Sequence, residues 1–117
     1  PTWPWGERAP ECRFVAFQPC GEGRPRGVAD ARSGDGASGA GVRDMAGTAG
    51  EWVADEYGPY PGGKAEAHPR PEAGRLRVVR GGSFGGDADD VRSTDRDAQA
   101  EGTRDRFVGF RCARDAP

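Results

Sequence analysis

Two carboxylates on a glycine- and alanine-rich stretch are the first side chains in this sequence whose types and spacing suit a chemical task. Asp44 and Glu51 stand seven residues apart, with Gly47 and Ala49 between them. Hard cations such as Ca²⁺ take about six to eight oxygen ligands, which carboxylates, backbone carbonyls and water supply together. Small residues let backbone carbonyls turn toward such an ion. The alternative interpretation is a solvated turn that leads into the apolar segment 52–54.

The three cysteines are the second reactive set. Cys12 and Cys20 are close in sequence, whereas Cys112 stands near the end of the chain. We predict a disulfide between Cys12 and Cys20 across a tight loop, which would indicate an oxidising, extracytoplasmic compartment. The alternative is two free thiols in a cytosolic protein. No Cys-x-x-Cys spacing occurs, and the single histidine, His68, lies in a proline-rich segment. Neither a zinc site nor a catalytic residue is therefore predicted.

The segment 85–105 is dense in charges of both signs. Such a segment is typical of a solvated face, in which exposed ion pairs contribute about 0–1 kcal/mol each. The functional interpretation is a surface that binds a ligand. Both interpretations stay open from the residues alone.

Three short strands are predicted to position these groups. Segment 76–80 is rich in valine and leucine and is followed by two glycines that favour a sharp turn. Segment 106–112 alternates with a period of two, which predicts that one set faces the core: Val108, Phe110 and Cys112. Together with 52–53, these strands are expected to share one small antiparallel sheet.

Length and composition bound the fold and exclude several classes of function. A chain of 117 residues forms one domain at most, and its 17 basic against 19 acidic residues leave it nearly neutral. No charge excess favours nucleic acid or an anionic membrane as a partner, and no apolar run approaches the ~20 residues that cross a bilayer. Leucine and isoleucine are almost absent, while three tryptophans are present. These counts predict a mostly irregular domain held by aromatic side chains and by a metal or a disulfide.

Four blocks of the sequence, in the same order, resemble the signature of one family. Residues 44–52, Asp-Met-Ala-Gly-Thr-Ala-Gly-Glu-Trp, resemble the Asp-Met-x-Gly-Asn-x-x-Glu-Trp motif of the formylglycine-generating enzyme family, also called the sulfatase-modifying factor family. Pro-Trp-Gly at 4–6, Arg-Val-Val-Arg-Gly-Gly-Ser-Phe at 77–84 and Gly-Phe-Arg-Cys at 109–112 resemble its other blocks. The resemblance implies a C-type-lectin-like fold of the α+β class, mostly irregular with a small antiparallel sheet.

The resemblance covers only the C-terminal part of a family domain. Family members carry a helix and the first strands of the fold upstream of Pro-Trp-Gly. We therefore expect residues 1–117 to be the C-terminal portion of a sulfatase-modifying-factor-type domain, incomplete on its N-terminal side. Such a piece is expected to come from a larger bacterial protein and to be marginally stable by itself.

The resemblance also implies which cofactors to expect. The family binds calcium through a side-chain oxygen, two backbone carbonyls and a glutamate, and the matching positions here are Asp44, Gly47, Ala49 and Glu51. The family's enzymes bind copper through a cysteine pair shortly after Gly-Gly-Ser-Tyr, since soft thiolates select Cu(I). The corresponding residues 85–91 contain no cysteine. We therefore expect Ca²⁺, no copper, and no formylglycine-generating activity.

Some binding proteins of the same fold, whose ligand-facing segment is diversified by retroelements, also resemble this chain in spacing. By that resemblance, Arg92, Arg96 and Arg111 are framework residues, and Arg92 and Arg96 are expected to pair with buried carboxylates or carbonyls. The side chains presented to a ligand would be Asp87, Asp89, Asp90, Asp97, Gln99, Glu101, Thr103 and Asp105.

Three functions are consistent with these features. The first is a catalytically silent domain that binds a protein or another ligand on a calcium-stabilised scaffold. The second is a formylglycine-generating oxidase that acts on a sulfatase cysteine, which the missing cysteine pair disfavours. The third is calcium-dependent carbohydrate binding, which rests on the lectin-like fold alone. The sequence favours the first.

Overall fold

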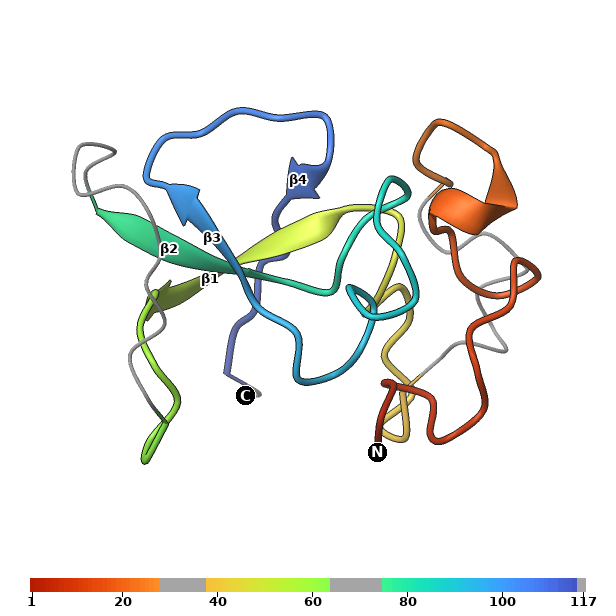
Figure 1. Cartoon of the computed structure of the whole chain (residues 1–117), viewed down its shortest axis with the longest axis horizontal. Helices are drawn as coiled ribbons and strands as arrows, with labels where there is room; N and C mark the ends of the chain where they lie inside the picture. Colours follow the sequence, from red (N-terminus) through yellow and green to blue (C-terminus); the bar gives the residue numbers. More distant parts are fainter. Residues whose placement is uncertain (28–37, 64–74, 116–117) are drawn as a thin grey trace.

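The computed structural model describes residues 1–27, 38–63 and 75–115, and His68 lies outside them. In the described residues the chain forms one short 3-10 helix and four strands: η1 (Gln18–Cys20), β1 (Gly50–Glu56), β2 (Leu76–Arg80), β3 (Asp97–Ala100) and β4 (Val108–Gly109) (Figure 1). Most of this part of the chain is irregular, as its composition predicts. It contains no α-helix, so the α part of the predicted α+β class is not confirmed. No helix in it is long and apolar enough to cross a membrane.

The four strands form one sheet in the order β3-β2-β1-β4. Strand β2 runs antiparallel to both β1 and β3, whereas β4 runs parallel to β1. The sheet is therefore mixed, and the predicted antiparallel pairing is right for β1 and β2 and wrong for β4. The physical reason is the connection. Strands β3 and β4 lie at opposite edges, so the segment 101–107 crosses from one edge to the other before β4 begins (Figure 1).

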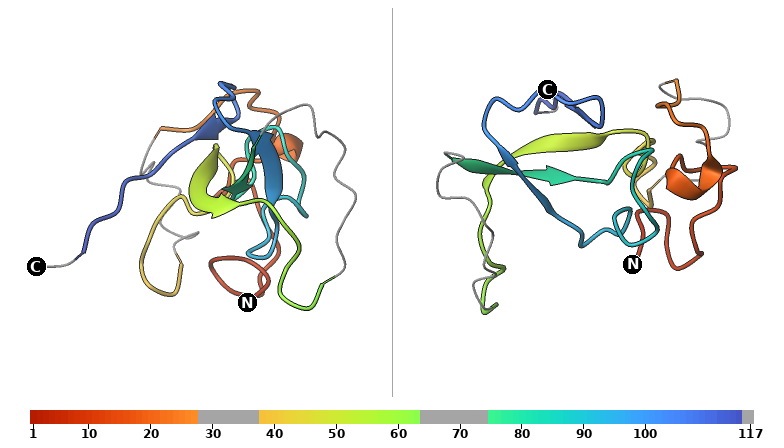
Figure 2. Two further views of the ribbon diagram at one scale, coloured as in Figure 1. Left: turned by 90° about the vertical axis from the view of Figure 1, so that its left-hand side faces the viewer. Right: turned by 45° about the horizontal axis from the view of Figure 1, so that its top comes forward.

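Two strand predictions differ in their outcome. Strand β2 has the predicted bounds, and it is followed by a turn at Gly81 and Gly82. Strand β4 is only two residues long, because its pairing with β1 ends at Gly109. Phe110 is therefore 78% exposed and Cys112 is exposed as well, so the prediction that they face the core is wrong. The chain after β4 extends away from the sheet (Figure 2).

Strand β3 lies inside a segment that the sequence predicts as a charged loop. It pairs with the free edge of β2, with Leu76 opposite Ala100 and Val79 opposite Asp97. Its sequence, Asp-Ala-Gln-Ala, has no β-branched or aromatic residue and gives no local strand signal. The strand exists because the edge of β2 offers unpaired backbone groups.

The core lies at one end of the sheet, where the N-terminal segment packs against the segment that follows β2. Its buried members are Phe14, Val15, Phe17, Ala46 and Val91, and Trp3 and Trp5 pack against them. Hydrogen bonds between distant segments hold this packing, since Gln18 N donates to Gly86 O at 2.7 Å. Phenylalanine and valine side chains thus share the burial, and the two partly buried tryptophans extend it.

Three backbone segments meet at Gly47. Its N–H donates to Gly81 O at 2.7 Å, and Thr48 N donates to Ala16 O at 3.0 Å. A Cβ on Gly47 would lie 2.3 Å from Ala16 O, and the residue has a φ of +71°. No side chain fits this position, so the glycine permits the loop before β1 to touch both other segments.

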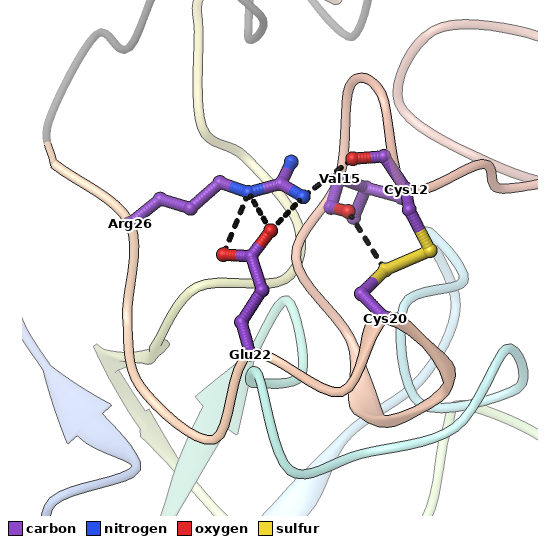
Figure 3. A network of polar contacts seen from close by, with 5 residues as sticks. All are labelled: Cys12, Val15, Cys20, Glu22 and Arg26. Carbon is purple, nitrogen blue, oxygen red and sulfur yellow. Dashed lines mark hydrogen bonds and ion pairs between the residues drawn. A yellow bond between two sulfur atoms is a disulfide. The ribbon is translucent and has the colours of Figure 1, made fainter.

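A disulfide between Cys12 and Cys20 closes the loop that carries Phe14 and Val15, with a Cα–Cα distance of 5.4 Å (Figure 3). The buried side chain of Arg26, which follows this loop in sequence, also bonds to it. Its Nη2 donates to the backbone oxygen of Cys12 and pairs with Glu22 Oε1 at 2.6 Å. The loop that supplies most of the core is therefore cross-linked covalently and by a buried guanidinium.

We expect the double variant Cys12→Ser, Cys20→Ser to lose about 2.5 kcal/mol of unfolding free energy, because the unfolded chain regains the entropy of an open loop. For a domain of this size the midpoint of thermal unfolding should fall by about 10 °C. Chemical denaturation would measure the free energy. Cys112→Ser, which removes an exposed thiol, is the matched control and should change little. Equal stability of the double variant and its parent would contradict a stabilising disulfide.

Candidate functional site

A pocket of about 380 Å³ lies beside the sheet, between β1, β2, β3 and the segment before β4. Four aspartates and one aromatic ring contribute most of its functional groups: Asp90, Asp95, Asp97, Asp105 and Phe107. The other residues that line it are small, apolar or neutral, and among the described residues no lysine, arginine or histidine lines it. We call it the acidic pocket.

A tight turn after β2 brings Asp90 to the pocket. Asp90 Oδ2 accepts a hydrogen bond from Asp87 N at 2.7 Å, and Asp87 Oδ1 accepts one from Asp89 N at 2.8 Å. A Cβ on Gly86 would lie 2.6 Å from Asp90 Oδ2, so only glycine lets the carboxylate sit this close to the backbone. Asp87 thus shapes the turn, while Asp90 lines the pocket.

Two side chains outside the pocket hold the turn that carries Asp95. Arg80, the last residue of β2, donates from Nη1 to the backbone oxygen of Asp95 at 2.6 Å. The hydroxyl of Tyr60 donates to the backbone oxygen of Thr94 at 2.9 Å, and the Arg96 guanidinium lies 3.6 Å from the centre of the Tyr60 ring. Sequence reasoning missed Asp95, Arg80 and Tyr60. Only Arg80 carried a signal, as the arginine that closes the strand motif 77–80.

The remaining groups come from β3 and from the segment before β4. Asp97 Oδ2 accepts a hydrogen bond from Gln99 Nε2 at 2.7 Å, which fixes both side chains along the strand. Asp105 Oδ1 accepts one from Phe107 N at 2.9 Å. The Phe107 ring packs against Phe84 with 4.8 Å between centroids, so it is a rigid apolar wall of the pocket.

Burial raises the pKa of Asp95 above its ordinary value, and the negative charges of Asp90 and Asp97 raise it further. The backbone N–H of Arg96 and the charge of Arg80 act in the opposite direction without cancelling the shift. Within the described residues, none of the pocket aspartates forms an ion pair with a lysine or arginine. The acidic pocket therefore concentrates negative charge that no basic side chain of the described residues balances by direct pairing.

The predicted ligand-facing set divides between the pocket and its surroundings. Four of its eight members line the pocket: Asp90, Asp97, Gln99 and Asp105. The other four do not: Asp87, Asp89, Glu101 and Thr103. Glu101 Oε1 lies 3.4 Å from Arg77 Nη2, and Asp89 pairs with Arg92 at 2.8 Å. The predicted ligand-facing segment thus borders the pocket, but sequence spacing did not separate the residues that line it from those on the outer surface.

The predicted framework arginines occupy different environments. Arg92 pairs with Asp89, whose side chain is 74% exposed, so the predicted buried carboxylate partner is wrong for Arg92 and this contact lies at the surface. Arg96 packs over the rings of Tyr57 and Tyr60. Arg111 bridges the chain after β4 to the loop before β1. Of the three arginines, Arg111 therefore makes the most direct connection between segments that are distant in sequence.

Arg111 contacts both charged residues of the predicted calcium set, Glu51 through its carboxylate and Asp44 through its backbone oxygen. Its Nη2 pairs with Glu51 Oε1 at 2.6 Å, and its guanidinium donates to the backbone oxygens of Arg43 and Asp44 at 2.9 and 2.8 Å. The hydrogen bonds to Glu51 raise the pKa of Arg111, to which the charges of Glu51 and Asp44 also contribute. In the part of the chain that the structure describes, no three His, Cys, Asp or Glu side chains gather around one point for a metal. Among the described residues, the guanidinium of Arg111 is thus a cationic group in direct contact with Glu51 and with this loop.

The pocket and its scaffold can be compared with known proteins. The profile of the sulfatase-modifying factor enzyme 1-like domain matches residues 2–116. The chain belongs to this family. A solved structure with a C-type-lectin-like fold, Treponema denticola variable protein 1, superposes with a TM-score of 0.66 and 26% identity, over 84% of this chain and 34% of that chain. The sulfatase-modifying-factor-type domain described here therefore shares the scaffold of a variable protein.

Two similar proteins are serine/threonine-protein kinases pkn1. The chain is 40% identical over 78 residues to that of Chlamydia caviae and 36% identical over 78 residues to that of Chlamydia pneumoniae. Each alignment covers 63% of this chain and 13% of the kinase. The chain thus spans a small part of the length of these relatives, in which the domain belongs to a larger protein.

The raised pKa of Asp95 predicts how stability depends on pH. A carboxyl group that binds its proton more tightly in the folded than in the unfolded state destabilises the fold once it is ionised. We therefore expect Asp95→Asn to raise the unfolding midpoint near neutral pH, by a few degrees at most because the group is partly solvated. The gain should disappear as the pH falls below the ordinary value of 3.8, where both states are protonated.

Thermal melts at a series of pH values would measure this effect. Asp55→Asn, which neutralises an exposed carboxylate on β1 outside the pocket, is the matched control. It should change the midpoint little at any pH. A gain for Asp95→Asn that is equally large at acidic and neutral pH would contradict the origin assigned to it.

Proposed function

We propose that this chain is a catalytically silent binding module, whose ligand occupies the acidic pocket. The observation that carries the proposal is the pocket itself. It is large enough for a ligand group, it lies beside a sheet on a C-type-lectin-like scaffold, and half of the predicted ligand-facing residues line it. The wall of the pocket is held by backbone hydrogen bonds and by Arg80, so its shape is formed in advance.

The arrangement of sulfur atoms supports catalytic silence. Copper chemistry of the kind the family's enzymes perform needs a pair of soft thiolates at the site. Here Cys12 and Cys20 are bonded to each other, and Cys112 is exposed on the chain after β4. None of the three lines the acidic pocket. No observation favours the formylglycine-generating oxidase or the carbohydrate-binding alternative over a binding module.

The module is proposed to serve inside a larger protein. In the two kinases the matching region is a small fraction of the whole length. A binding domain joined to other domains brings its ligand to them at a raised effective concentration. The partner of this chain is proposed to be a protein or another molecule, neither a nucleic acid nor a membrane.

A pocket-blocking variant tests the function without changing charge. Gln99→Trp fills the pocket from β3, whereas Ala113→Trp adds the same ring on the exposed chain after β4. Peptides selected from a displayed random library on the parent chain should bind Ala113→Trp equally and bind Gln99→Trp at least about tenfold more weakly, because a buried aromatic excludes the ligand. Surface plasmon resonance would measure the affinities, with folding checked by thermal melts.

Two results would contradict the proposal. One is a set of selected peptides that bind Gln99→Trp and the parent with equal affinity. The other is conversion of the cysteine of a sulfatase-derived peptide to formylglycine by the copper-treated chain, detected by mass spectrometry. Equal peptide binding would show that the pocket is not the binding site. Conversion of the cysteine would show that the chain is an active enzyme.

Calcium stays a prediction attached to this proposal. An ion bound by Asp44, Gly47, Ala49 and Glu51 would compete with the guanidinium of Arg111 for the Glu51 carboxylate. A calcium-stabilised scaffold therefore predicts that Ca²⁺ raises the unfolding midpoint, and that it does so more strongly in Arg111→Gln, where that carboxylate is released.

Melts with calcium and with a chelator would measure both responses. The double variant Asp44→Asn, Glu51→Gln is the control and should not respond to calcium, because it lacks both charged ligands. A midpoint unaffected by calcium in the parent and in Arg111→Gln would remove calcium from the proposal. Arg111 would then be the cation that orders the loop, and the binding function would stand.

A further inference from the structure

The charged side chains that line the acidic pocket all carry negative charge. Asp90, Asp95, Asp97 and Asp105 all line a single cavity, yet no basic side chain among the described residues lines it. A concave site with low-dielectric walls concentrates the field of such charges and raises the local concentration of oppositely charged molecules. An anionic or purely apolar ligand would leave these carboxylates desolvated and unpaired, which costs free energy. The pocket therefore discriminates in favour of positive charge.

The geometry separates an organic cation from a metal ion. A metal needs several ligand atoms that converge at a short distance, and no three acidic, histidine or cysteine side chains of the described residues do so. The carboxylates are instead distributed around a volume of about 380 Å³, with the Phe107 ring as an apolar wall. A group with spread positive charge and an aliphatic stem matches both features, since the stem packs on the ring and the charge meets the carboxylates.

Hydrogen bonds orient two of the pocket carboxylates and still leave oxygen lone pairs that can accept a hydrogen bond from a ligand. Asp97 and Asp90 each receive hydrogen bonds from neighbouring backbone N–H groups, which fix their direction. A carboxylate accepts more than one or two such bonds, so its remaining lone pairs stay available to a ligand donor. Arg80 steadies the Asp95 backbone but does not itself line the pocket.

We propose that the acidic pocket binds an organic cation, an ammonium or guanidinium group on an aliphatic stem, with Asp90, Asp95 and Asp97 receiving its charge. This inference rests on the proposed function and names the chemistry of its ligand. Two sources share that chemistry: a lysine or arginine side chain of a partner protein, and a free polyamine. The pocket volume accommodates one such group rather than a folded segment.

Titration of the whole chain with small probes tests the inference. The probes are Nα-acetyl-lysine methylamide, Nα-acetyl-arginine methylamide and spermidine, with Nα-acetyl-norleucine methylamide as the uncharged counterpart. We expect the charged probes to bind and the norleucine probe not to bind, as followed by amide NMR shifts of pocket residues. Tighter binding of the amino-acid probes indicates a protein partner, and tighter binding of spermidine indicates a polyamine.

Matched variants test which carboxylates bind the cationic probe. Asp97→Asn should weaken binding of the preferred probe about tenfold, because a charge-assisted hydrogen bond is lost. Asp55→Asn removes a carboxylate of the same type from β1 outside the pocket and should change affinity less than about twofold. Affinity should also fall as the pH is lowered and Asp95 takes up a proton. Burial raises the pKa of Asp95, and the charges of Asp90 and Asp97 raise it further, against the opposing effects of the Arg96 N–H and the Arg80 charge.

The outcomes distinguish this inference from the function on which it rests. Peptides that need an open pocket, as judged by Gln99→Trp, but carry no excess of lysine or arginine would overturn the cation and leave the binding module. Equal binding of the lysine and norleucine probes, or binding of Ca²⁺ in the pocket without binding of any organic cation, would overturn it as well. Absence of any pocket-dependent ligand would overturn both.

Discussion

The close meeting of three backbone segments at Gly47 is the constraint on which the rest of this structure depends. The loop before β1 donates to Ala16 O and to Gly81 O, while Phe84 N donates to Thr48 O at 3.2 Å. Backbone groups buried at such a crossing must all find partners, and here each segment supplies them for the others. A domain with few aliphatic residues is thereby ordered mainly by specific hydrogen bonds and aromatic packing, with a disulfide closing the loop that contributes most to the core.

The same crossing shapes the acidic pocket. The turn after β2 is bonded to the loop before β1 through Gly81, and to the N-terminal segment through Gly86. In the same turn, Gly82 and Gly86 pack against Asp90, and all three residues line the cavity. Scaffold and site therefore share one set of backbone bonds. This frame holds the like charges of Asp90, Asp95 and Asp97 close together, which burial and mutual repulsion make unfavourable for Asp95.

Arg111 shows how the chain supplies a cation of its own. The family resemblance pointed to an ion at the loop before β1, and a guanidinium lies there on the carboxylate of Glu51 and on two backbone carbonyls. A planar guanidinium has several donors in fixed directions, so it satisfies a carboxylate and carbonyls together. Because Arg111 is part of the chain after β4, these contacts also connect that segment to β1 and to the loop before it.

Four features could be predicted from residue types alone: the family, strand β2 with its following Gly-Gly turn, the irregular character of the chain and the absence of cysteines from the segment that lines the pocket. These features are local, since they depend on residue types at short spacing. Tertiary structure decided the parallel direction of β4, the existence of β3, the partner of Glu51 and the division of the aspartates between pocket and surface. In an irregular chain no period of two or of 3.6 tells where a side chain points. Contacts between residues far apart in sequence, such as Arg80 with the turn that carries Asp95, set those directions.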